Sequence, residues 1–310
     1  MKRETSNAKR SAEDEQTTVN EVVPKLKRVA LVIGAGSVKC AAAIGLRKVF
    51  QREGIELDMV VGCSGGSLYA ATMALGHDAQ TIADMTRRLW TREITERRSY
   101  SAWLRMLLPG VFGFDERFGL LDDRVIMDRL RAAFGDATFA DARIPLYIVA
   151  TDLRNGEQVV LSRGGLVDAI RASIAIPLLF APHPIEDRLL VDGYLSDPLP
   201  VGVAIKEGAD VIVAMGFESH FQSRITSLPR FSLHLTSLMT NNLLRAKFGL
   251  HNLAHHGEVI PVIPKFTQRI SQFDTDKIPY IVEEGERAAE EQVPYIRRLL
   301  EREPAPMQTL

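Results

Sequence analysis

Short apolar runs alternate with longer amphipathic segments along most of this chain. Apolar runs that end near glycine or aspartate predict buried strands at 29–33, 58–62, 145–151 and 210–215, with shorter strands at 158–161 and 188–191. Helical spacing and the absence of breakers predict helices at 41–51, 166–176 and 201–207. Strands that alternate with helices indicate an α/β fold, with a mostly parallel central sheet covered by helices.

The same pattern predicts one main domain. Residues 1–25 are polar, mixed in charge and without apolar periodicity, which is typical of a disordered tail. We expect the domain to cover 26–301, with a core at 28–215 and a helical C-terminal part at 225–301. Two prolines, Pro304 and Pro306, end the last helical pattern, so 302–310 form a closing tail.

The strand at 58–62 leads into the pentapeptide GCSGG, in which Ser64 stands between Gly62 and Gly66. A breaker-free stretch that can form a helix follows it. Strand, Gly-x-Ser-x-Gly and helix make the context of a nucleophile elbow, where a strained turn exposes the serine hydroxyl. Gly/Ser loops after strands also bind phosphates or only turn the chain, so this motif does not decide the function by itself.

A second motif, Asp192-Gly193-Tyr194, closes the strand at 188–191. An Asp-Gly pair after a strand is usually only a turn. However, ligands bind at the ends of strands in open α/β sheets, and a serine needs a base to become a nucleophile. Asp192 is therefore the candidate that accepts the proton of Ser64 directly.

A third motif is the loop Gly34-Ala35-Gly36-Ser37-Val38-Lys39-Cys40, which leads from the first strand into a helix. Its backbone N–H groups are candidates to hold a developing oxyanion. A dinucleotide-binding loop is the alternative, although Lys39 stands where the third glycine of that motif belongs.

Taken together and in this order, the three motifs resemble the patatin-like phospholipase family. The resemblance covers most of 28–215 and is strong at 41–46, 149–153 and 172–177. It implies a three-layer fold and hydrolysis of fatty-acyl esters of (lyso)phospholipids or related lipids, without a metal or other cofactor. It implies these site residues: the dyad Ser64 and Asp192; the oxyanion loop with Gly34, Gly36, Ser37, Val38 and Lys39; the elbow glycines Gly62 and Gly66; and Gly193 with Tyr194.

Two departures from the family pattern bear on activity. The oxyanion loop of the family, Gly-Gly-Gly-x-Arg/Lys-Gly, aligns with residues 35–40, where Ala35, Ser37 and Cys40 replace glycine. Tyr194 replaces a glycine or alanine. A side chain restricts backbone conformations that glycine allows. The sequence therefore also leaves open a lipid- or acyl-binding regulatory protein with little turnover.

Histidines and cysteines add two further hypotheses. Five histidines follow Asp192, so a Ser–Asp–His triad is an alternative to the dyad, and one pair four residues apart could ligate a metal. They are His220, His234, His251, His255 and His256. The order of the motifs favours the dyad. The two cysteines, Cys40 and Cys63, are too few for a disulfide framework, and as a weaker hypothesis they form a redox-sensitive pair beside Ser64.

Charge and composition limit the classes of binding partner that we expect. A net charge of −1 over 310 residues gives no electrostatic reason to expect nucleic-acid binding. No apolar run approaches the ~20 residues of a membrane span, and no signal-peptide core is evident, so we expect a cytoplasmic protein. Apolar residues at 99–121 predict either core packing or a cap that contacts acyl chains or a membrane surface. A stripe of Phe231, Leu235, Leu238 and Met239 is interpreted as core.

Overall fold

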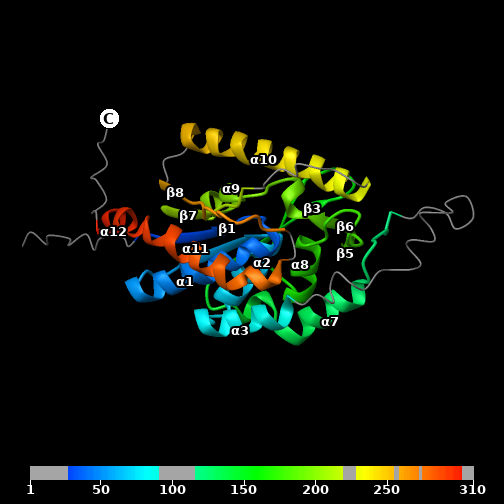
Figure 1. Ribbon diagram of the computed structural model, residues 1–310, viewed down its shortest axis with the longest axis horizontal. Coiled ribbons are helices and arrows are strands. Elements are labelled where there is room, and N and C mark those ends of the chain that lie inside the picture. The colour runs from blue at the N-terminus through cyan, green and yellow to red at the C-terminus, as the bar shows by residue number, and fades with distance from the viewer. Residues whose placement is uncertain (1–26, 91–115, 219–227, 255–257, 272–273, 302–310) are drawn as a thin grey trace, which may run out of the picture.

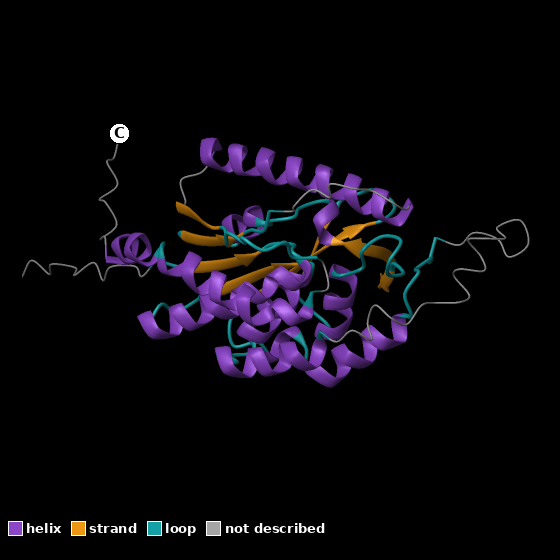
Figure 2. Ribbon diagram, viewed as in Figure 1, coloured by secondary structure: helices purple, strands orange, loops and turns teal. Residues whose placement is uncertain are grey.

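The structure is a computed structural model that describes residues 27–90, 116–218, 228–254, 258–271 and 274–301. These residues form three layers, with a sheet between two groups of helices (Figure 1, Figure 2). The tails predicted at 1–25 and 302–310 lie outside the described residues, as does most of the apolar segment at 99–121.

The described part of the chain contains an eight-stranded sheet with the order β5-β6-β3-β2-β1-β7-β8, and β4 pairs with β3. Strands β1, β2, β3, β7 and β8 are parallel, whereas β4, β5 and β6 pair antiparallel at one end of the sheet. The bounds are β1 Val29–Ile33, β2 Met59–Cys63, β3 Leu146–Asp152, β4 Gln158–Leu161, β5 His183–Ile185, β6 Arg188–Asp192, β7 Val211–Met215 and β8 Glu258–Val262. The predicted mostly parallel α/β fold is confirmed.

Helices cover both faces of this sheet, as Figure 1 shows. One face carries α1 Ala42–Glu53, α2 Gly65–Ala74, α3 Ala79–Leu89, α7 Asp123–Phe134, α8 Leu166–Ser173 and α11 Ile278–Glu290, with α12 Val293–Glu301 after them. The other face carries α9 Val201–Lys206 and the long helix α10 Leu228–Ala254. A short 3-10 helix, Ser37–Ala41, follows β1. Another, Gly193–Leu195, follows directly after Asp192, the last residue of β6.

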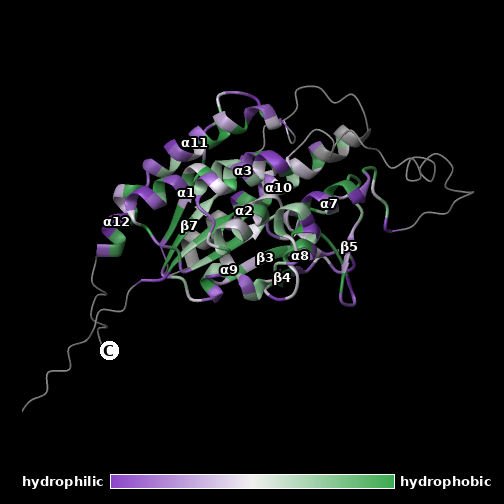
Figure 3. Ribbon diagram, turned by 90° about the horizontal axis from the view of Figure 1, so that it is seen from below, coloured by the Kyte–Doolittle hydropathy of each residue, from purple (hydrophilic) through white to green (hydrophobic). Residues whose placement is uncertain are grey.

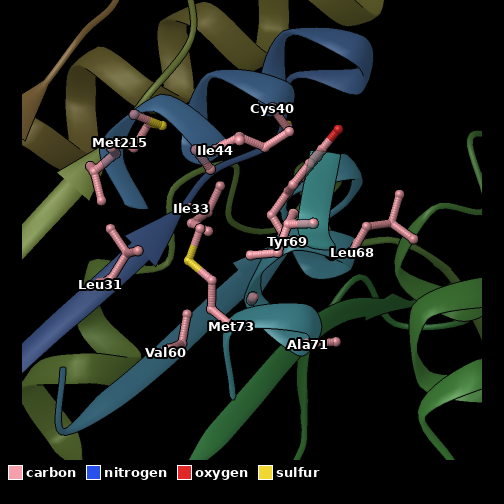
Figure 4. Close-up of a cluster of buried hydrophobic side chains, with 14 of the residues drawn as sticks. Leu31, Ile33, Cys40, Ile44, Val60, Leu68, Tyr69, Ala71, Met73 and Met215 are labelled. Carbon is pink, nitrogen blue, oxygen red and sulfur yellow. The ribbon is translucent and has the colours of Figure 1, made fainter. Parts of the chain in front are cut away.

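Alternation along the strands produces two main apolar cores, and a third, smaller cluster contains Ala150, Val159, Ala172 and Leu190. Leu31, Ile33 and Val60 face α1 and α2 in the larger core (Figure 4), while Ala30 and Val32 face α9 in the smaller one. Successive side chains of a strand point to opposite faces, so a strand covered on both sides is apolar at every position. Figure 3 shows the result, with hydrophobic residues concentrated on the strands and inner helix faces.

The structure corrects two expectations about the C-terminal part. It is not helical throughout, because β8 (Glu258–Val262) adds a parallel strand beside β7. Pro261 obscured this strand in the sequence, but proline is tolerated in an edge strand. The core interpretation of the α10 stripe is wrong for Phe231, Leu235 and Met239, whose exposed fractions are 45%, 42% and 73%.

None of the helices in the described residues is long and apolar enough to cross a lipid bilayer.

Candidate active site

Ser64 and Asp192 are brought together by the register of β3. Residues 148–149 of β3 pair with β2 and β4, and residues 150–151 pair with β4 and β6. Because a strand has only two edges, β2 and β6 lie end to end along the same edge of β3. Cys63 is opposite Val149, and Asp192 is opposite the next residue, Ala150. The residue that follows β2, Ser64, therefore meets the last residue of β6.

The turn at Ser64 is strained. Ser64 has φ 54° and ψ −131° between the end of β2 and the start of α2, a conformation that costs a non-glycine residue on the order of 1–3 kcal/mol. The flanking glycines allow the turn by close approach. A Cβ at Gly62 would lie 2.6 Å from the Ser67 Cα, and a Cβ at Gly66 would lie 2.3 Å from the Ile33 carbonyl oxygen. The Gly-x-Ser-x-Gly spacing is thus required by packing.

Hydrogen bonds fix both members of the pair. The Ser64 hydroxyl donates to Asp192 Oδ2 at 2.7 Å, and the backbone N–H of Tyr194 donates to Asp192 Oδ1 at 3.1 Å. The backbone N–H of Ser64 donates to the Ser173 hydroxyl at 2.9 Å, which donates in turn to the Val149 carbonyl at 2.7 Å. The serine hydroxyl therefore contacts a carboxylate oxygen directly, with no imidazole between them.

Burial gives the Asp192 carboxyl the properties of a base. Asp192 is completely buried, and loss of hydration raises its pKa from 3.8 to about 7. The hydrogen bonds from Ser64 and the Tyr194 N–H oppose this rise because they stabilise the carboxylate. A base is most effective when its pKa is close to the working pH, so Asp192 is suited to take a proton near neutrality.

The loop after β1 lies against the start of α2. A Cβ at Gly65 would lie 2.7 Å from the Ser37 carbonyl oxygen and 3.1 Å from the Ser37 backbone nitrogen. Ser37 itself has φ 51°, in the region that favours glycine. The structure thus brings the Ser37 amide close to the residue that follows Ser64. The same packing disfavours a dinucleotide at Gly34 and Gly36, because α2 occupies the space in front of the loop.

Two residues of the resemblance have side chains directed elsewhere. The Lys39 ammonium donates to the Glu218 carbonyl at 2.8 Å, and burial lowers its pKa. The Tyr194 side chain is hydrogen-bonded to Thr236 of α10, and burial raises its pKa. Lys39 and Tyr194 thus brace the loops after β1 and β6 rather than present their polar ends to Ser64.

An apolar pocket of about 340 Å³, including its mouth, opens at Ser64. Its walls are formed by Ser37, Ser64, Gly65, Trp90, Ile126, Ile174, Ile176 and Phe180. Apart from the two serines, the side chains in this set offer carbon surface or an indole ring. Such a pocket matches a hydrocarbon chain.

Sequence reasoning missed two residues that organise the site. Ser173 joins the Ser64 N–H to β3, and Arg171, fully buried, holds the pocket wall. The guanidinium of Arg171 lies 5.4 Å from the ring centre of Phe180, donates to the Ala181 carbonyl at 2.8 Å and pairs with Asp123. The available signal was a polar and a charged residue on the buried face of helix 166–173.

The two cysteines lie in different cores. Cys40 is buried in the larger core and Cys63 in the smaller one, on the other face of the sheet (Figure 4 labels Cys40). Burial raises the pKa of both thiols well above 9, which keeps them protonated. This placement disfavours the redox pair, which stays a prediction.

Most of the histidines named in the triad and metal hypotheses have side chains outside the described residues. His220, His255 and His256 lie outside the described residues, as does the side chain of His251. His234 lies on α10. Within the residues that the structure describes, no group of three or more His, Cys, Asp and Glu side chains is placed to hold a metal ion.

Comparison with known proteins identifies a family. The family model described as Patatin-like phospholipase matches residues 31–205, more than half of the chain. Relatives in Mycobacterium bovis and Mycobacterium tuberculosis, named uncharacterized NTE family proteins, are 35% identical over 188 residues. The match covers 61% of this chain and 48% of those proteins. This chain thus spans about half the length of the mycobacterial relatives that it matches.

More distant matches are also found. Neuropathy target esterase sws of Drosophila melanogaster is 28% identical over 201 residues, which cover 64% of this chain and 13% of the fly protein. Among solved structures, VipD from Legionella pneumophila superposes with a TM-score of 0.47 at 14% identity, covering 88% of this chain and 67% of that chain.

Proposed function

The chain belongs to the patatin-like phospholipase family, and on this premise we propose that it hydrolyses fatty-acyl esters of (lyso)phospholipids or related lipids through a Ser64–Asp192 dyad. The observation that carries the proposal is the 2.7 Å hydrogen bond from the hydroxyl of a strained serine to a buried carboxylate. A positioned base and a hydroxyl in direct contact are the minimum equipment for nucleophilic catalysis.

In the first half-reaction, Ser64 Oγ attacks the ester carbonyl carbon while its proton passes to Asp192 Oδ2. The carbonyl oxygen becomes an oxyanion, which the backbone N–H groups of the 36–38 loop stabilise. Collapse of this intermediate breaks the ester C–O bond, and the leaving alcohol takes the proton from Asp192. The acyl group is then esterified to Ser64.

In the second half-reaction, water replaces the alcohol. Asp192 accepts a proton from the water, whose oxygen attacks the acyl carbon, and the same N–H groups hold the second oxyanion. Breakage of the bond to Ser64 Oγ releases the fatty acid, and Ser64 regains its proton from Asp192. The pKa of Asp192, about 7, supports both directions of transfer.

The apolar pocket at Ser64 supports an acyl chain as the group recognised. Ile126, Ile174 and Phe180 supply its hydrocarbon walls. Each buried methylene contributes about 0.8 kcal/mol of transfer free energy, so a chain of several carbons would be held firmly against these walls.

The test is labelling with a fluorophosphonate, followed by release of fatty acid from phospholipid and lysophospholipid. We expect wild type to be labelled at Ser64 and to release fatty acid, and Ser64→Ala and Asp192→Asn to lose both. Far-ultraviolet circular dichroism checks that the variants are folded. A wild type that is folded but neither labelled nor active would contradict the proposal.

A second function is favoured by one observation, the left-handed Ser37 in the oxyanion loop. A strained loop with side chains in place of glycine supports an acyl-binding protein with little turnover. That function predicts binding of fatty acid by wild type and by Ser64→Ala with equal affinity, together with the absence of hydrolysis.

A further inference from the structure

A second apolar cavity lies beside the pocket at Ser64. Its empty space is about 240 Å³, including the open space at its mouth, and is lined by α2, α3, Trp90 and the end of α7. Its lining residues are Leu68, Tyr69, Thr72, Ile82, Met85, Thr86, Leu89, Trp90 and Phe134. Figure 1 shows α2, α3 and α7 together on one side of the sheet, and Figure 4 shows Leu68 and Tyr69 on α2.

The polar atoms of two lining residues are already satisfied. The Thr72 hydroxyl donates to the Tyr69 carbonyl at 2.9 Å, and the Thr86 hydroxyl donates to the Ile82 carbonyl at 2.7 Å. Bonded in this way, neither threonine requires a polar ligand. The hydroxyl of Tyr69, by contrast, is buried and has no hydrogen-bond partner among the described residues. The other lining side chains offer mainly carbon surface, which suits hydrocarbon.

Trp90 is the residue shared by the two spaces. It lines the pocket that contains Ser64 and also the second cavity. It follows directly after α3 (Ala79–Leu89), so its indole stands where the two spaces adjoin.

The direction from Ser64 to the second cavity follows α2. Leu68 and Thr72, which line the second cavity, lie one turn apart on one face of α2, the helix that begins directly after Ser64. The eight residues from Ser64 to Thr72, at 1.5 Å each, give about 12 Å. An extended hydrocarbon advances about 1.25 Å per C–C bond, so about ten carbons cover this length.

We propose that the second cavity is the subsite for the distal part of the acyl chain, and that Trp90 and Met85 set the preferred chain length. This inference rests on the proposed ester hydrolysis at Ser64. Short acyl chains end in the pocket at Ser64, whereas longer chains pass Trp90 and bury further methylenes between α2 and α3. Each of these methylenes raises kcat/KM by about fourfold, as its transfer free energy requires.

The test measures kcat/KM for p-nitrophenyl butyrate, octanoate, dodecanoate and palmitate, each below its aggregation limit. Met85 is half-buried in the cavity wall, so Met85→Trp fills the cavity. We expect the ratio of kcat/KM for dodecanoate to that for butyrate to fall at least tenfold. Trp90→Ala opens the boundary and shifts the optimum to longer chains. Met127→Trp, at a half-buried methionine of α7 that lines neither space, is the matched control and keeps the wild-type ratio.

A second measurement covers the case in which Met85→Trp fails to fold. The chain has two tryptophans, Trp90 and Trp103, so Trp103→Phe leaves Trp90 as the reporter. We expect a dodecyl fluorophosphonate bound to Ser64 to shift the emission of Trp90 further than an ethyl fluorophosphonate does, because Trp90 lines both spaces. Equal emission with both adducts would overturn the inference.

These measurements distinguish failure of the second subsite from failure of the proposed ester hydrolysis. Hydrolysis that depends on Ser64 with the same chain-length profile in wild type, Met85→Trp and Trp90→Ala would overturn the second subsite and leave the proposed function intact. Absence of labelling and of hydrolysis at every chain length would overturn both.

Discussion

Two serines with a positive φ stand at the ends of neighbouring parallel strands. Ser37 follows β1 with φ 51°, and Ser64 follows β2 with φ 54°. The loops touch, because the Ser37 backbone lies within van der Waals distance of a Cβ placed at Gly65. The Ser64 hydroxyl donates to the Asp192 carboxylate. The positive φ is shared, so it cannot by itself identify a nucleophile.

The difference lies in what each strained turn presents. At Ser64 the turn directs a side chain toward Asp192, and a residue without a hydroxyl would remove the hydrogen bond to Asp192 Oδ2. At Ser37 the strain belongs to a loop in which the family resemblance implies glycine, and the backbone amide is the group of interest. Under the proposed function, strain at Ser64 positions a side-chain hydroxyl, whereas strain at Ser37 positions a backbone N–H group.

Removal of each hydroxyl should give the largest contrast between the two. We expect Ser64→Ala to lower kcat/KM for ester hydrolysis by about 10⁴-fold or more, because no other group supplies the nucleophile. Ser37→Ala keeps the backbone N–H and should retain activity within about tenfold. Steady-state hydrolysis of p-nitrophenyl octanoate measures both. Comparable losses in the two variants would mean that the two serines share the chemistry.

The pH dependence of kcat/KM should report the ionisation of Asp192, the base that contacts Ser64. Asp192 must be ionised to accept a proton, and burial raises its pKa to about 7. Below that pH, kcat/KM should fall about tenfold per unit, reaching about a hundredfold at pH about 5. A profile that stays flat down to pH about 5 would exclude Asp192 as the base.

The free energy of unfolding should depend on the ionisation of Asp192 in the opposite direction to activity, so it should rise as pH falls. In the unfolded chain its pKa is near 3.8, so between pH 3.8 and about 7 the folded state binds a proton that the unfolded state does not. This contribution is complete below the lower value and is lost as pH rises through about 7. Wild type should therefore lose about 3 kcal/mol relative to Asp192→Asn between pH about 5 and pH about 8, measured by urea denaturation.

Much of this comparison was predictable from sequence. The spacing around Ser64, the strand before it and the Asp-Gly pair at Asp192 are local signals, and the fold they implied is confirmed by the sheet order. The end-to-end placement of β2 and β6 along β3 was not predictable, because register depends on tertiary pairing. Ser173 was missed for the same reason, since its partners lie on other elements.

Contact between the two loops can be broken at Gly66. A Cβ there would lie 2.3 Å from the Ile33 carbonyl oxygen and 2.7 Å from that of Gly34, both backbone atoms. Gly66→Ala should therefore destabilise the protein by about 2–3 kcal/mol in denaturant unfolding. Gly165→Ala is the matched control, because its nearest atom would be 3.7 Å away and its φ is −74°, and we expect a change within about 0.5 kcal/mol. Equal stabilities of the two variants would show that the loops do not need this close approach.

The smallest effect separates strain from chemistry at the two serines. Glycine and alanine both remove the hydroxyl, but only glycine adopts a positive φ without steric cost, at the expense of a more flexible unfolded chain. Ser37→Gly should therefore be more stable than Ser37→Ala by about 1 kcal/mol, and Ser64→Gly should exceed Ser64→Ala by at least as much, since ψ −131° at Ser64 is a costlier conformation for a side chain. Urea denaturation of the four variants gives both differences.

Activity divides the same variants in another way, because both Ser37 variants should hydrolyse esters and both Ser64 variants should not. An alanine variant at Ser37 that equals the glycine variant in stability would show that this loop is not strained, and the eroded glycine pattern would then carry no penalty for the oxyanion site.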